Sequence, residues 1–245
     1  MNATTANNLA HPVAHHFDDA EQQYVAAELG MWLFLATEVL FFGGVFCGYA
    51  MYRYQYPAEF IAGSHRLDAW LGTINTAVLL TSSLTMVLAV HAAQTNRRGL
   101  LVANLLLTML LGAAFLGIKG FEYHHKFEEH LVPGRNFNFV EHAEAKDAHE
   151  GSSGKSQLTV TESSGRVVDV DERNVELFFS LYFAMTGLHA LHMVIGIGLL
   201  AVLVVGAVRG RFGGGYFTPI EMTGLYWHFV DIVWVFLFPL LYLIR

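Results

Sequence analysis

Charged residues are scarce in this sequence of 245 residues. Only 14% are Asp, Glu, Lys or Arg, whereas 54% are hydrophobic, and the mean hydropathy is +0.41. A soluble domain usually carries about 25% charged residues. The composition therefore indicates an integral membrane protein rather than a soluble one.

Cysteine and basic residues are also rare. The single cysteine, Cys47, excludes an intrachain disulfide and a cluster of thiolate metal ligands. The formal net charge of −7 and the absence of a basic run argue against nucleic acid as a partner. The first 25 residues contain no Lys or Arg, so we expect no cleavable signal peptide.

Long apolar runs, in contrast, are abundant. They occur at 29–51, 70–93, 100–121, 177–207 and 223–244, and a membrane-spanning helix needs roughly 20 residues. Backbone groups in lipid must be bonded within each segment, so we predict an all-α integral membrane protein, a bundle of five transmembrane helices. The predicted parts are a polar N-terminal segment (1–25), helices 1–3 (26–122), an acidic loop (123–173) and helices 4–5 (174–245).

The acidic loop between the third and fourth predicted helices is long and polar. From Glu122 to Glu172 there are eleven acidic and five basic residues. Its stretch "QLTVTESSGRVVDV" consists of two β-prone runs around Ser-Ser-Gly, which predicts a hairpin. An external acidic surface could attract a basic partner or simply be solvated, and both interpretations stay open.

Orientation depends on a small difference in positive charge. With the N-terminus inside, the short cytoplasmic connections hold four arginines and the opposite side three; these are Arg97, Arg98, Arg209 and Arg211 against Arg53, Arg66 and Arg245. The excess predicts a cytoplasmic N-terminus and, after five spans, a periplasmic C-terminus.

Several ionisable groups fall inside the predicted spans, where they are costly. Glu38 is mid-span and could accept a proton, gate a path, or form a neutral hydrogen bond to a neighbouring helix. His189 and His192 lie one helical turn apart, and His228 and Asp231 share a face of the last span. These four could form interhelical bonds, a metal or haem site, or a proton path. Pairing Asp231 with a histidine would satisfy both groups.

Polar residues of the second and third spans suggest helix packing. Small hydroxyl residues allow close helix approach, so we interpret the second span's polar residues as a packing face; they are Asn75, Thr76, Thr81, Ser82, Ser83 and Thr85. Lys119 and Glu122 share a face at the end of the third span. We expect them to pair near the membrane interface.

Five motifs follow one another along the chain. The first, "ELGMWLFLATEVLFFGGVF", contains Glu38, and the second, "INTAVLLTSSLTMVLAVH", contains Asn75, Thr76 and His91. Then come "LGAAFLGIKGFEYHH", "FFSLYFAMTGLHALHMVIG" and "EMTGLYWHFVDIVW". In this order they resemble the helices of subunit III of the haem–copper cytochrome c oxidases, across all five spans. Glu38 matches that family's intramembrane glutamate, while Lys119 stands where the family usually has Gln.

The resemblance implies a non-catalytic subunit. Haem and copper would be held by partner subunits and none by this chain, which would pack directly against oxidase catalytic subunit I and contact other oxidase subunits. Supporting proton uptake and oxygen access, and protecting the enzyme from turnover inactivation, are the implied roles. The matched polar residues would then form an intramembrane network or support a proton path; they are Glu38, Asn75, His91, Glu122, His189, His192, Glu221, His228 and Asp231.

The sequence also departs from the family. The mitochondrial type has seven spans, and this chain begins at the equivalent of the third, so the missing pair would remove one arm of a lipid cleft. Arg209 matches an arginine near lipid headgroups, which makes bound phospholipid an expectation at that end only. The long acidic loop is atypical and favours a bacterial oxidase of the inner membrane, with a cytochrome c donor or a larger respiratory assembly as further partners.

We therefore expect subunit III of a proton-pumping haem–copper cytochrome c oxidase active in aerobic electron transport. Two alternatives remain. A nitric oxide reductase accessory subunit of the same family would carry the same motifs, although such chains are usually compact. A free-standing membrane metalloenzyme would use the histidines as ligands. No inverted repeat supports a transporter.

Overall fold

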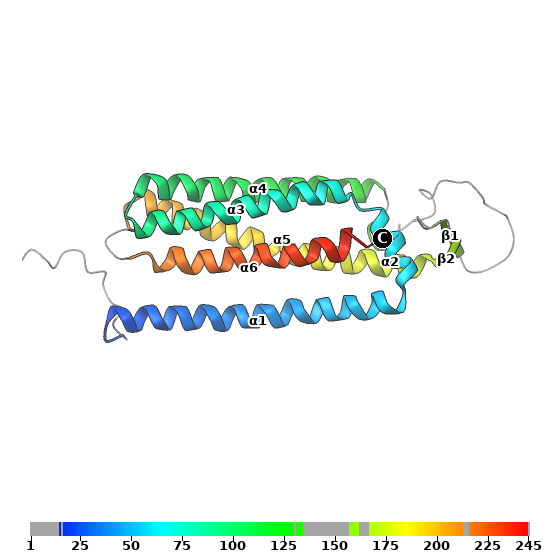
Figure 1. The fold of residues 1–245 in the computed structure, drawn as a ribbon, viewed down its shortest axis with the longest axis horizontal. Coiled ribbons are helices and arrows are strands. Elements are labelled where there is room, and N and C mark those ends of the chain that lie inside the picture. Colours follow the sequence, from blue (N-terminus) through cyan, green and yellow to red (C-terminus); the bar gives the residue numbers. More distant parts are fainter. Residues whose placement is uncertain are drawn as a thin grey trace, which may run out of the picture. The chain divides into compact units, whose positions relative to one another are not determined.

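The computed structural model describes residues 15, 17–129, 131–134, 157–161, 167–212 and 216–244. Its elements, labelled in Figure 1, are helices α1 (Ala20–Gln55), α2 (Pro57–His65), α3 (Ala69–Gln94) and α4 (Arg98–Glu128), strands β1 (Gln157–Thr161) and β2 (Val167–Asp171), and helices α5 (Glu172–Val208) and α6 (Thr218–Tyr242).

Five of these helices, α1, α3, α4, α5 and α6, are long and apolar enough to cross a membrane. The predicted all-α membrane fold with five spans is thus confirmed. The helix boundaries differ from the predicted ones at most ends. Helix α1 begins at Ala20, inside the segment predicted to be polar (1–25), α4 continues beyond the predicted limit at 122 to Glu128, and α5 begins at Glu172, before the predicted start at 174. Helix α6 begins at Thr218, before the apolar run predicted at 223–244, and ends inside that run at Tyr242.

Helix α2 was not predicted. Pro57 and Gly63 suggest a plain connection, but Pro57 occupies the first turn of α2, where the missing N–H of proline costs nothing. Proline also disfavours helical geometry in the residue before it, which accounts for the break after Gln55. A helix of nine residues is too short for its sequence pattern to identify it.

Aspartates and positive-φ residues mark the helix ends. The Asp19 carboxylate accepts from the backbone N–H of Gln22 at 2.7 Å, and Asp68 accepts from that of Trp70 at 2.9 Å. Such caps satisfy N–H groups that have no partner within the helix. Asn96 (φ 56°) and Gly210 (φ 72°) end α3 and α5 in left-handed conformations.

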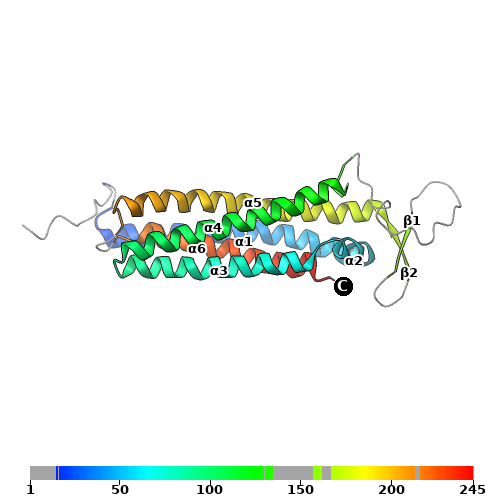
Figure 2. The same cartoon turned by 90° about the horizontal axis from the view of Figure 1, so that it is seen from above.

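The strands β1 and β2 form an antiparallel hairpin, with Gln157 opposite Asp171. Figure 2 shows them beyond the N-terminal end of α5. The hairpin predicted around Ser-Ser-Gly is confirmed. Most of the remaining predicted loop lies outside the described residues.

The chain divides into two compact units, each of which contains part of every long helix. Unit 1 comprises Met1–Phe41, Val78–Ala113 and His192–Asp231, and unit 2 comprises Phe42–Ala77, Ala114–Leu191 and Ile232–Arg245. Each unit has its own buried residues, and each is considered separately below.

Unit 1 is built around Trp227, which is fully buried. Gly112 of α4 and Gly196 of α5 both face its indole: a Cβ at these positions would lie 2.7 Å and 2.9 Å from ring atoms. Helices can approach this closely only where the side chain is small. The two glycines therefore make room for Trp227.

Unit 2 has an aromatic core. Phe60 of α2 meets Phe178 of α5 edge to face, with ring centroids 5.3 Å apart, and Phe115 of α4 meets Trp234 of α6 in the same way at 4.9 Å. Edge-to-face pairs add to the stabilisation that comes from burying apolar area.

Candidate functional site

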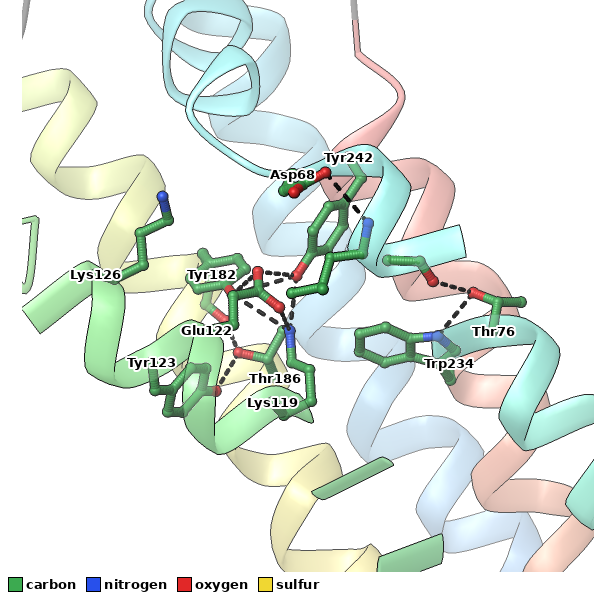
Figure 3. Close-up of polar contacts among 12 residues, drawn as sticks. Asp68, Thr76, Lys119, Glu122, Tyr123, Lys126, Tyr182, Thr186, Trp234 and Tyr242 are labelled. Atoms are coloured by element: carbon green, nitrogen blue, oxygen red, sulfur yellow. Dashed lines mark hydrogen bonds and ion pairs between the residues drawn. The ribbon is translucent and has the colours of Figure 1, made fainter. Parts of the chain in front are cut away.

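The polar cluster of unit 2 centres on Glu122, as Figure 3 shows. Its carboxylate lies 2.9 Å from the Lys119 ammonium and accepts from the hydroxyls of Tyr182 and Tyr242, at 2.8 Å and 2.5 Å. Lys119 also donates to the Tyr242 hydroxyl at 2.7 Å. We call these four residues, from α4, α5 and α6, the Glu122 cluster.

The predicted pairing of Lys119 with Glu122 is confirmed. Both side chains are 5% exposed, so the pair is buried in the protein rather than solvated. The Lys119 ammonium also lies 4.9 Å from the centroid of the Trp234 ring, a cation–π distance. Every charge in the cluster therefore has partners, as burial requires.

Other polar residues of unit 2 lie close to this cluster, among them the predicted residues Thr76 and His189. Thr186 shares a hydrogen bond with the Tyr123 hydroxyl, and Thr76 accepts from the Trp234 indole at 3.0 Å (Figure 3). His189 is buried between the rings of Phe115 and Trp234, with centroids at 5.4 Å and 5.3 Å. These contacts are those of a helix-packing core.

Asn75 is also in unit 2 and is 1% exposed. Neither atom of its amide hydrogen-bonds to another described residue. The interhelical bond expected of Asn75 is therefore absent from the part of the chain that the structure describes. A buried amide without hydrogen-bond partners lowers the stability of the fold.

In unit 1, Glu38 of α1 pairs with His192 of α5. The Glu38 carboxylate oxygen lies 3.1 Å from Nε2 of His192, and the two side chains are 19% and 13% exposed. The Tyr226 hydroxyl of α6 donates to the backbone carbonyl of His192 at 2.9 Å. The Glu38–His192 pair and the Tyr226 bond together connect α1, α5 and α6 within unit 1.

A second set of unit 1 bonds joins α3, α4 and α6. Ser83 and Nδ1 of His228 share a hydrogen bond of 2.6 Å, and the Trp227 indole donates to Ser82 at 3.1 Å. Thr85 and Thr108 share another at 2.7 Å. The hydroxyl residues interpreted as a packing face therefore bond across helices.

The predicted pairing of Asp231 with a histidine is wrong. His228 bonds to Ser83 instead. Asp231 is 3% exposed, and neither carboxyl oxygen has a hydrogen bond of normal geometry to a described residue, although Ser83 is near enough to interact with it. His228 and Asp231 lie on the same side of α6, as their spacing predicts, but the His228 side chain bonds to α3 rather than to Asp231.

Glu221, near the start of α6, receives two donors. Gln94 of α3 donates to one carboxylate oxygen at 2.8 Å, and the Tyr24 hydroxyl of α1 donates to the other at 3.3 Å. This third set of bonds again connects three helices. Neither Gln94 nor Tyr24 was singled out from the sequence, because nothing in the spacing shows which helices lie opposite Glu221.

The remaining predicted residues of unit 1 are exposed. His91 borders a pocket with a volume of about 480 Å³, which Glu221 and His228 also line. Arg209 lies in the turn after α5. Among the described residues, no group of three or more His, Cys, Asp or Glu side chains is placed to hold a metal ion.

Comparison with known proteins identifies the family of this chain. The family model of cytochrome c oxidase subunit III matches residues 14–128 and 173–244. The chain belongs to this family. The two matched ranges contain all five spans and leave out the segment between α4 and α5.

Individual relatives are similar over nearly the whole chain. Cytochrome bo(3) ubiquinol oxidase subunit 3 of Pseudomonas aeruginosa is 30% identical over 96% of this chain and 92% of its own length. Cytochrome c oxidase subunit 3 of Alkalihalophilus pseudofirmus is 31% identical over 88% of this chain and 85% of its own. A heme-copper oxidase subunit I+III of Aeropyrum pernix is 26% identical over 87% of this chain and 22% of its own length.

Proposed function

We propose that this chain is the non-catalytic subunit III of a proton-pumping haem–copper oxidase in a bacterial inner membrane. Catalytic subunit I packs directly against it, and the haem and copper centres belong to the partner subunits. The family match supports the assignment. Direct packing is supported by the relative whose name combines subunits I and III.

One observation carries the supportive role. Most of the intramembrane ionisable groups that the structure describes bond to residues of this chain: Glu38 to His192, Glu122 to Lys119, and Glu221 to Gln94 and Tyr24. Groups that are already satisfied in this way stabilise helix packing. A stable bundle beside subunit I would support proton uptake and oxygen access in subunit I and prolong the time for which the oxidase sustains turnover.

The topology belongs to the same proposal. The N-terminus is cytoplasmic and the C-terminus periplasmic, in keeping with the excess of arginine in the short connections. The turn after α5 then lies on the cytoplasmic side, where exposed Arg209 can meet lipid phosphates. A soluble or tethered cytochrome, or quinol, would deliver electrons to the partner subunits.

Affinity purification through this chain in mild detergent tests the proposal. We expect a large partner subunit, identified by mass spectrometry, and the absorbance of haem in the purified complex. Stronger detergent should then release this chain without stoichiometric iron, copper or zinc. Recovery with a nitric oxide reductase, or metal retained by the released chain, would replace the proposal with one of the two alternatives.

A further inference from the structure

The pocket of unit 1 is formed by three helices. Its wall includes Glu28 and Trp32 of α1, His91 of α3 and Glu221 of α6, and its volume is about 480 Å³. Pockets of this size commonly hold a ligand or an inserted group. The proposed function does not use it, although all the residues around it belong to one unit.

Negative charge without a counterion is the main property of this pocket. Glu28 and Glu221 contribute two carboxylates, and none of the residues that line the pocket is Lys or Arg. Glu221 is already held by Gln94 and Tyr24. In contrast, neither Glu28 nor His91 has a side-chain hydrogen bond or ion pair with another residue of the described chain.

The arrangement suits an ammonium group on an aliphatic stem. The acceptors come from three different helices, as Glu28, His91 and Glu221. An ammonium carries three donors that diverge, whereas a guanidinium requires planar partners. The indole of Trp32, also in the wall, can receive a cation on its face.

A lysine fits this pocket better than an aminophospholipid. The phosphate of such a lipid would enter beside two carboxylates with no Lys or Arg to neutralise it. A lysine brings only the positive charge and an apolar stem. The pocket therefore favours a protein over a lipid as the source of the ammonium.

The surface of α1 beside the pocket can receive the helix that would carry this lysine. In its most apolar stretch only 11% of residues are buried, against 50% in α6. Leu29 and Leu33, which flank Trp32 on α1, are 69% and 67% exposed. A partner helix that packed on this apolar surface would bring its side chains to the pocket.

We infer that the pocket bounded by Glu28, His91 and Glu221 receives a lysine from a transmembrane helix of the oxidase catalytic subunit. This inference rests on the proposed function, because it takes its partner from there. The inserted lysine gives Glu28 the counterion it lacks and fixes the position of α1 against the partner. Charge pairs of this kind set the register of an interface.

A water-soluble carbodiimide tests the inference, because it joins a carboxylate to an adjacent primary amine as an amide. The intact complex is treated and digested, and the cross-linked peptides are identified by mass spectrometry. We expect Glu28 joined to a lysine of the catalytic subunit. This product should disappear in Glu28→Gln, which removes the charge of a side chain without hydrogen-bond partners, and persist in Glu21→Gln, whose site is on α1 but outside the pocket.

An accessibility control makes a negative result decisive. In the released chain, carbodiimide with added glycine methyl ester should label Glu28, and in the intact complex this label should be lost. If the complex contains haem but Glu28 is joined to phosphatidylethanolamine, to the chain's own N-terminal amine or to nothing, the inference is overturned and the proposed function survives. If no haem-bearing subunit co-purifies, the proposed function fails as well.

Charge reversal gives a second readout. Glu28→Lys should reduce the haem that co-purifies with this chain by about tenfold or more, because reversing one charge of an interfacial pair weakens the affinity between the two subunits. Glu21→Lys should leave the retained haem unchanged. Equal retention in both variants would overturn the inference.

Discussion

The ammonium of Lys119 and the carboxylate of Glu122 lie 2.9 Å apart, and each side chain is 5% exposed. Two tyrosine hydroxyls complete the coordination of this carboxylate. Breaking a buried ion pair on one side leaves the other charge without compensation, which is far more costly than losing a solvated pair. The Glu122 cluster is therefore a strong test of what stabilises unit 2.

We expect Lys119→Met to destabilise the protein by about 3–5 kcal/mol, because Glu122 then stays buried without a cation. Adding Glu122→Gln should recover much of that loss. Thermal unfolding in detergent measures both. Glu128→Gln is the matched control, since it breaks the exposed pair of Glu128 with His124, and should change stability by no more than about 1 kcal/mol. Equal effects of Lys119→Met and Glu128→Gln would contradict a structural role for the cluster.

A second prediction tests whether His228 bonds to Ser83 or pairs with Asp231. Ser83→Ala should cost about 1–3 kcal/mol, because the imidazole loses its hydrogen bond in a partly buried site. Asp231→Asn should leave stability unchanged or raise it, since it breaks no well-formed hydrogen bond and removes an ionisable group from a buried site. Unfolding curves of the two variants distinguish the cases. A larger loss in Asp231→Asn would restore the histidine–aspartate pairing.

The contacts of the histidines could be predicted only in part from the sequence. The motifs identified Glu38, Glu122 and Glu221 as intramembrane groups, and the periodicity correctly placed Lys119 beside Glu122 on one helix. Partners on other helices could not be predicted, because a helical repeat shows which residues share a face but not which helix lies opposite. For this reason the bond of His228 to Ser83 was missed.

Local elements were predictable to different degrees. The five spans follow from long apolar runs, and the hairpin follows from β-prone runs around a turn. Helix α2 has neither signal, since its proline and glycine look like connection residues. The pocket could not be predicted either, because it depends on side chains from three helices.

A third prediction concerns Glu38 in the assembled oxidase. Glu38→Ala should leave the haem spectrum unchanged and shorten the time for which the enzyme sustains turnover, because the hydrogen bond between Glu38 of α1 and His192 of α5 is lost. Glu38→Gln keeps a hydrogen-bonding oxygen without the charge. If Glu38→Gln survives turnover as long as the wild type, the bond matters; if it fails like Glu38→Ala, the ionisable carboxyl matters. Unchanged survival of both variants would leave Glu38 a packing role only.

The last prediction uses two glycines of α5. Gly196→Ala should destabilise the protein by about 1–3 kcal/mol, because the new Cβ would lie 2.9 Å from the buried Trp227 ring and force it to move. Gly198→Ala, two residues along the same helix, meets nothing within 4 Å. It should be neutral or stabilising by up to about 1 kcal/mol, since alanine favours the helix over glycine. Thermal unfolding of both variants measures the difference. If the two substitutions behaved alike, the close approach of α5 to Trp227 would be wrong, and with it the packing that brings α3, α4 and α6 together around Ser82 and Ser83.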